Sequence, residues 1–297
     1  MTSAKIDPIY SPARQFLLII LTIFIACLLY EFLEFYSLKH SAVLFLGIPV
    51  FMSIALAVAS DIKHVTINIV LGLSFGLLVS FLYLNEGSFC VPITAPLFLI
   101  TGLIVSSSFI KLKQSNYSQL IYFLPVLFLL ILSLEGLTSH TTLSRNKLIQ
   151  TVKVVQLSGD EVQQALTQNR SFSQLPFMLS IGFPQPTKVS NQGSEVGDIR
   201  SVYFSGGEGD PGTAEFQVTH RTPNSIEYRL VNDSSHISHW LKWKSSKVSW
   251  VELDPAKTRV SWSIEYERQL DPAWYFSTLQ NFAVKLSAEA LIENLIL

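Results

Sequence analysis

The sequence predicts a two-part protein, with an N-terminal all-α transmembrane bundle of about five helices followed by a C-terminal α+β domain. Three observations predict it. Apolar runs of about 20 residues fill the first half, charged residues gather in the second half, and near residue 150 the hydrophobic pattern changes to one that includes alternating strands. We therefore place a transmembrane helical domain at 1–140 and a second domain at 150–297.

The composition supports this division. Charged residues make up only 14% of the 297 residues, against about 25% in ordinary soluble domains. Of the 21 lysines and arginines, 6 precede residue 140 and 15 follow it, and the 22 acidic residues divide into 6 and 16. The second half is nearly neutral and has no basic stripe, which argues against nucleic acid as a partner. Two cysteines are too few for a disulfide framework or a thiolate metal site.

Five apolar runs are long enough to cross a bilayer, which takes about 20 residues. They cover approximately 15–35, 42–60, 65–84, 91–110 and 117–136. The first run is too long for a signal peptide and lacks a small-x-small cleavage site, so we expect it to be retained. In the third run, Gly72 and Gly76 form a GxxxG pair, which favours close helix packing either within one chain or between two chains.

Basic residues in the short loops predict the orientation. With a cytoplasmic N-terminus, the inner side carries Lys5, Arg14, Lys63, Lys111 and Lys113, whereas the outer short loops carry only Lys39. Five spans then place the C-terminal domain outside the cytoplasm, and one span more or fewer would reverse this.

The stretch EGSFCVPITAP, residues 86–96, joins the third and fourth runs on the same side as the C-terminal domain. Gly87 permits a tight turn, and Pro92 suits the start of a helix. A structural turn therefore explains most of the stretch. The alternative is an interface beneath the outer domain, for which Glu86 and Cys90 are the candidate residues.

From residue 150 onward we expect mainly strands, separated by turn signals such as GGEGDPG, PN and DPAK. The expected strands cover 151–157, 198–205, 213–222, 225–232, 239–253 and 258–270, and the expected helices begin at Asp160, cover 173–182 and cover 272–295. In the last strand, Val260, Trp262, Ile264, Tyr266 and Arg268 alternate with polar residues. This alternation predicts an antiparallel sheet that is buried on one face.

The segment VSWSIEYER, the junction DPAWYF and the long helix that follows resemble the START-like helix-grip family, the SRPBCC and polyketide cyclase group. The resemblance covers about 150–297. It implies a curved antiparallel sheet around the long C-terminal helix, with a cavity between them that holds an apolar or amphipathic molecule. Joined to five spans, such a domain looks like bacterial multi-pass proteins of the cytoplasmic (inner) membrane.

Motifs for catalysis are missing: the sequence has no nucleophile elbow, phosphate-binding loop, dinucleotide fingerprint or zinc motif. His236 and His239 read as strand residues three apart, which would point to opposite faces. We therefore lean against an enzyme, and we expect no cofactor and no metal.

The expected ligand-binding residues are aromatic and apolar side chains of the sheet and of the last helix, with one arginine. They are Tyr228, Trp240, Trp262, Tyr266, Arg268, Tyr275, Leu279 and Phe282. The alternative is that they fill an ordinary core. A buried-side arginine needs an anionic partner, which for Arg268 is either an internal acid or the head group of a ligand.

These features predict an integral membrane protein whose C-terminal domain binds a lipid-like or other hydrophobic ligand near the membrane surface. The alternative is a non-catalytic scaffold or assembly module that acts through protein partners. The expected partners are the lipid bilayer, a hydrophobic small molecule or lipid, and a second membrane protein.

Overall fold

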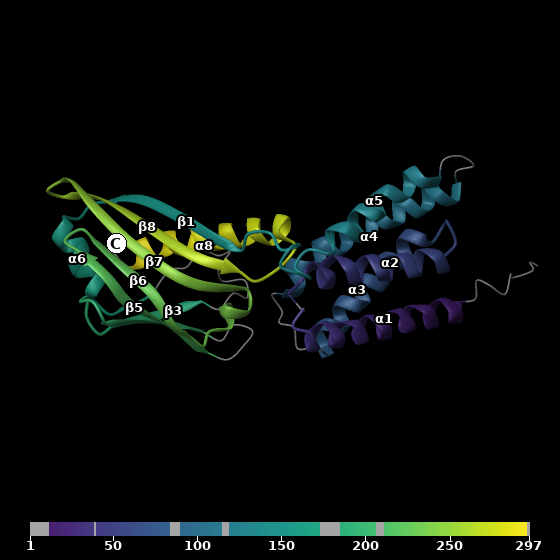
Figure 1. Ribbon diagram of the computed structural model, residues 1–297, viewed down its shortest axis with the longest axis horizontal. Helices are drawn as coiled ribbons and strands as arrows, with labels where there is room; N and C mark the ends of the chain where they lie inside the picture. Colours follow the sequence, from purple (N-terminus) through teal and green to yellow (C-terminus); the bar gives the residue numbers. More distant parts are fainter. Residues whose placement is uncertain are drawn as a thin grey trace, which may run out of the picture. The chain divides into compact units, whose positions relative to one another are not determined.

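The computed structural model describes residues 12–38, 40–83, 90–114, 119–172, 185–205 and 211–295. The chain divides into two compact units, Met1–Leu143 and Ser144–Leu297 (Figure 1). Each unit is described by itself below.

The first unit is helical, and its helices follow the apolar runs. They are α1 (Pro12–Phe35), α2 (Ile48–Ala59), α3 (Val65–Tyr83), α4 (Cys90–Gln114) and α5 (Gln119–Leu132), with a short π-helix, Val43–Gly47, before α2. Three segments are long and apolar enough to span a membrane: Phe16–Phe35, Val65–Leu82 and Val91–Gln114. The apolar helices Val43–Ala59 and Ile121–Leu132 are shorter. A bundle of five spans, and its orientation, therefore stay predictions.

The two glycines of the GxxxG pair pack within the chain. A Cβ atom added at Gly72 would lie 2.4 Å from Cδ1 of Leu56, and one added at Gly76 would lie 3.2 Å from Cε of Met52. Leu56 and Met52 both belong to α2, so the missing side chains let α2 and α3 approach closely. This is the intramolecular alternative of the two that the sequence left open.

Some expectations fall outside the described residues. Glu86 is among them, as are the helical piece expected at 173–182 and residues 206–210 of the Gly-rich turn. Cys90 is the first residue of α4, and only its backbone is described. The interface expected at Glu86 and Cys90 stays a prediction.

The second unit contains one antiparallel sheet, which has eight strands in the part of the chain that the structure describes. They are β1 (Asn146–Val155), β2 (Arg170–Ser171), β3 (Pro186–Asn191), β4 (Ile199–Phe204), β5 (Gly212–Thr222), β6 (Ser225–Asp233), β7 (Leu241–Asp254) and β8 (Lys257–Arg268). Their order across the sheet is β1-β8-β7-β6-β5-β4-β3-β2. Two further helices belong to this unit, α6 (Gly159–Thr167) and the long C-terminal α8 (Ala273–Leu295).

The sheet curls around α8. This helix lies beside β1 and β8, at one end of the strand order (Figure 1). It also contacts β2, at the other end of the order. A flat sheet of eight strands could not bring both of its edges to one helix, because neighbouring strands lie about 4.8 Å apart. A curled antiparallel sheet around a long C-terminal helix is the helix-grip arrangement that the resemblance implied.

The structure corrects the expected strands in three places. The strands β2 and β3 were missed, because one is very short and the other, PTKVSN, is polar and begins with proline. The first strand begins earlier than expected, at Asn146. The segment His236–His239 forms a 3-10 helix rather than the start of a strand, and β7 begins after it at Leu241.

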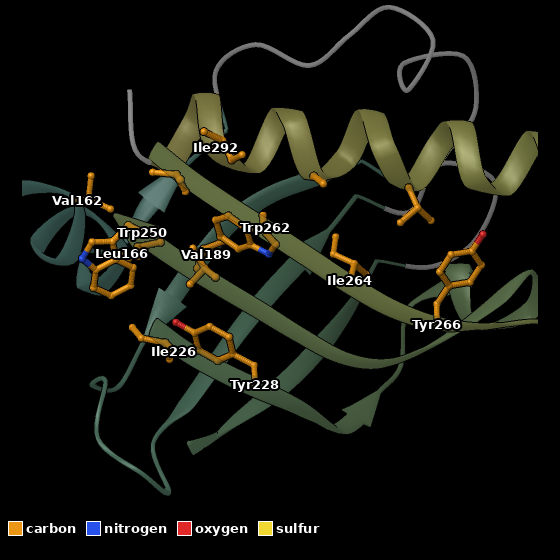
Figure 2. Close-up of a cluster of buried hydrophobic side chains, with 14 of the residues drawn as sticks. Val162, Leu166, Val189, Ile226, Tyr228, Trp250, Trp262, Ile264, Tyr266 and Ile292 are labelled. Carbon is orange, nitrogen blue, oxygen red and sulfur yellow. The ribbon is translucent and has the colours of Figure 1, made fainter. Parts of the chain in front are cut away.

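The core of this unit lies on the inner face of the sheet. Val260, Trp262, Ile264 and Tyr266 of β8 are each at most 4% exposed, so the alternation expected for this strand is confirmed. Figure 2 shows Trp262, Ile264 and Tyr266 between β8 and α8, with Tyr228 on the neighbouring part of the sheet. The inner face therefore combines aliphatic side chains with large rings that carry polar atoms.

Candidate functional site

The candidate site is the region where the inner face of the sheet packs against α8. Four of the expected ligand-binding residues are buried there or at its border: Tyr228 on β6, Trp262 and Tyr266 on β8, and Trp240 just before β7. The Trp262 indole Nε1 donates a 2.8 Å hydrogen bond to Ser246 Oγ. The Tyr266 hydroxyl donates a 2.7 Å hydrogen bond to Asn281 Oδ1 on α8, which ties the sheet to the helix.

Arg268 is fully buried and pairs with an internal acid. Its guanidinium donates to a carboxylate oxygen of Asp271, which is also fully buried, and to the Leu270 carbonyl oxygen. The other carboxylate oxygen of Asp271 accepts a 2.7 Å hydrogen bond from Arg145, which directly precedes β1. This is the internal acid that the sequence offered as one of two partners for Arg268, and it links β8 to the start of α8. Contact of Arg268 with a ligand stays a prediction.

The buried face of α8 differs from the expected one. Leu279 is 38% exposed, Phe282 is 51% exposed and Tyr275 is half-buried. The residues of α8 that pack inward instead are Phe276, Gln280, Val284, Ala288 and Ile292.

Two polar residues explain this difference. The expected face of α8 was chosen from the spacing of its apolar residues, so it did not include Gln280 and Asn281. Both of these side chains have hydrogen-bond partners inside the unit. Gln280 Nε2 donates a 2.8 Å hydrogen bond to the Trp240 carbonyl oxygen, and Asn281 accepts from Tyr266. A polar side chain with a partner can be buried at little cost, which a hydrophobic pattern does not register.

Several polar atoms in the same region are buried without a hydrogen-bond partner. Among the described residues these include Trp243 Nε1 on β7, and Ser277 Oγ and Gln280 Oε1 on α8. Trp243 lies opposite Tyr266 in the β7–β8 register, and their ring centroids are 6.4 Å apart. Native proteins leave few buried polar groups unpaired, so an ordered water or another small molecule could satisfy these groups.

A second arginine of the inner face was missed by the sequence reasoning. Arg200 on β4 is only 4% exposed, and its Nη1 donates a 3.1 Å hydrogen bond to the Tyr228 hydroxyl. Its guanidinium carbon lies 5.3 Å from the Tyr228 ring centroid and 5.6 Å from that of Trp262. Arg200, Val202 and Phe204 are two residues apart along β4 and therefore share one face of the strand. Val202 and Phe204 pack against the core, so the sequence could have placed Arg200 on the inner face as well.

His236 and His239 are close together rather than on opposite faces. Their rings lie 4.7 Å apart because the 3-10 helix, unlike a strand, brings residues three apart onto one side. Over the described ranges, no group of three or more His, Cys, Asp or Glu side chains could hold a metal ion.

Burial changes the acid–base behaviour of Tyr266. It raises the pKa of this phenol to about 12, and the positive charge of Arg268 partly offsets the rise. Tyr266 therefore keeps its proton at neutral pH and remains the donor to Asn281. The folded chain holds this proton more tightly than the unfolded chain, whose tyrosine pKa is about 10.

We expect this difference to appear as a loss of stability at alkaline pH. The contribution of Tyr266 is complete below about pH 10 and is lost as the pH rises toward about 12. Tyr266→Phe should remove this contribution to the loss of stability. The measurement is the urea midpoint of the full chain between about pH 10 and about pH 12. Tyr203→Phe is the control, because Tyr203 is 39% exposed. A midpoint for Tyr266→Phe that falls as steeply as that of the unchanged chain would contradict the assignment.

No protein-family model matches the sequence, and no curated protein matches it. Solved structures that match are START-like helix-grip proteins. Norcoclaurine synthase from Thalictrum flavum is 13% identical, with 50% of this chain and 85% of that chain covered and a TM-score of 0.33. A START superfamily protein from Mycobacterium smegmatis is 16% identical, with 48% and 93% covered and a TM-score of 0.34.

The ZhuI aromatase/cyclase from Streptomyces sp. R1128 is 15% identical, with 50% of this chain and 95% of that chain covered and a TM-score of 0.33. At these identities and TM-scores the matches describe a likeness in fold, and we base no conclusion about function on them.

Proposed function

We propose that the C-terminal unit binds an apolar or amphipathic small molecule, such as a lipid, between the inner face of its sheet and α8. The apolar helices of the first unit would anchor this binding unit to a membrane. The proposed function is therefore ligand binding. The apolar and aromatic side chains of the inner face favour an apolar or amphipathic ligand.

One observation carries the proposal, namely the buried polar atoms that lack partners among large aromatic rings. They are Trp243 Nε1, which packs against the hydrophobic core, and Ser277 Oγ and Gln280 Oε1 on α8. Small-molecule sites are lined mainly by hydrophobic and aromatic side chains, with a few placed polar groups that fix the orientation of the ligand. A core whose only role is packing satisfies such groups internally or with ordered water.

The tryptophans of the chain offer a direct test. All five, Trp240, Trp243, Trp250, Trp262 and Trp274, lie in the C-terminal unit, so tryptophan fluorescence of the full chain reports on this unit alone. We expect dibromostearyl alcohol, added to the full chain in phosphatidylcholine nanodiscs, to quench this fluorescence saturably. Bromine quenches tryptophan on contact, so saturation indicates a site of limited capacity.

Unlabelled stearyl alcohol should restore the fluorescence by competition. Quenching that rises linearly with the probe and is insensitive to the competitor would contradict the proposal, because it would show only partition of the probe into the bilayer.

A further inference from the structure

We infer that Arg200 binds the anionic head group, a carboxylate or phosphate oxyanion, of the amphipathic molecule held between the sheet and α8. The inference rests on the proposed ligand binding and adds the chemical class of the ligand. It assigns to the site a residue that lies on β4, far along the strand order from β8.

The first argument is the missing counter-ion. Arg200 is 4% exposed, and within the part of the chain that the structure describes no carboxylate pairs with it. Its Nη2 has no hydrogen-bond partner there. A buried charge is costly unless it is paired and hydrogen-bonded, so this arginine retains an unused donor and an unneutralised charge.

The other arginines buried in this unit show what a completed pairing looks like. Arg268 and the partly buried Arg145 share the carboxylate of Asp271, and each donates to a different oxygen. Arg200 has instead the hydroxyl of Tyr228 and the faces of two aromatic rings. Cation–π contacts of this kind stabilise a guanidinium, but they leave its charge in place and leave Nη2 available for an anion.

The position of Arg200 fits an amphipathic ligand rather than a free ion. Its side chain reaches from β4 to rings on β6 and β8, which lie across the curled sheet (Figure 2 shows these two rings, of Tyr228 and Trp262). On its own strand, Val202 and Phe204 pack against the hydrophobic core. An anion at Nη2 would therefore have apolar surface beside it, which suits a molecule with a hydrocarbon portion.

The test compares two probes that share the same brominated hydrocarbon chain and differ in the head group. Dibromostearic acid carries a carboxylate, whereas dibromostearyl alcohol is neutral, and both quench tryptophan fluorescence of the full chain in phosphatidylcholine nanodiscs. We expect the acid to bind more tightly by about tenfold to a hundredfold, the effect of a hydrogen bond to a charged group. Arg200→Met should reduce the affinity for the acid to that for the alcohol and leave the alcohol unchanged.

Two further variants make the result specific. Arg259→Met removes the same charge from an exposed position on β8 and should leave both affinities unchanged. Arg200→Lys keeps the charge but loses the planar guanidinium, which can donate two parallel hydrogen bonds to a carboxylate. This variant should therefore bind the acid with intermediate affinity. Arg200→Met loses the hydrogen bond to Tyr228 but also removes the cost of burying a charge that has no carboxylate partner, so the urea midpoint of Arg200→Met should stay close to that of the unchanged chain.

The outcomes separate the two proposals. Saturable quenching with equal affinities for acid and alcohol would overturn the role of Arg200 and leave ligand binding standing. Loss of saturable quenching by both probes in the unchanged chain would overturn the proposed function itself. Displacement of the acid by sodium acetate at equal concentration would show a site for small free anions and would also overturn the inference.

Discussion

Replacing Asp271 by asparagine is expected to destabilise the C-terminal unit by about 3–5 kcal/mol, because it removes one partner of a buried ion pair and leaves the other charged. Asp271 is fully buried, and its two oxygens accept from Arg268 and Arg145. Asparagine keeps the shape but supplies only one acceptor oxygen. The residues involved join the start of β1 to the junction of β8 and α8, so the loss affects both.

The measurement is urea unfolding of the full chain, followed by tryptophan fluorescence, which reports on the C-terminal unit. Asp254→Asn is the matched control, since Asp254 lies exposed at the end of β7. The double variant Arg268→Met, Asp271→Leu should recover part of the loss, because it replaces the fully buried pair by apolar side chains. The cation that then lacks Asp271 as a partner is Arg145, which is only partly buried. Equal midpoints for Asp271→Asn and Asp254→Asn would show that this pair does not hold the junction.

Replacing Phe276 by alanine is expected to cost about 3–5 kcal/mol, whereas the same change at Phe282 should cost about 0.5 kcal/mol or less. Phe276 is 2% exposed and lies on the same face of α8 as the buried Val284, while Phe282 is 51% exposed. The two variants delete the same atoms from the same helix, so their difference isolates burial. This comparison decides between the observed face of α8 and the face that the sequence favours.

Urea midpoints of the full chain provide the measurement here as well. A larger loss for Phe282→Ala than for Phe276→Ala would mean that α8 is rotated relative to the structure. The candidate site would then be lined by Leu279 and Phe282, as expected from the sequence, rather than by Gln280.

The sequence predicted those parts of the fold in which the hydrophobic pattern is regular. Strand β8 alternates strictly, so its inner face was predicted residue by residue. The apolar runs of the first half were equally clear, and each overlaps one of the helices α1 to α5. Arg200 could have been found by the same reasoning, since it shares the face of Val202 and Phe204.

Other features depend on tertiary contacts that a pattern does not contain. The face of α8 depends on the buried Gln280 and the half-buried Asn281, whose side chains find partners in Trp240 and Tyr266 from elsewhere in the chain. The pairing of Arg268 with Asp271 was open for the same reason. The short strand β2 pairs with β3, and its two residues are too few to show a strand pattern in the sequence.

The most direct test of ligand binding between the sheet and α8 is the quenching titration read from two single-tryptophan chains. One retains only Trp262, which is 2% exposed on the inner face, and the other retains only Trp274, which is 51% exposed at the start of α8. We expect dibromostearyl alcohol to quench Trp262 saturably and Trp274 weakly and without saturation. Saturable quenching confined to Trp274 would place the bound molecule outside the sheet and would contradict the proposed site.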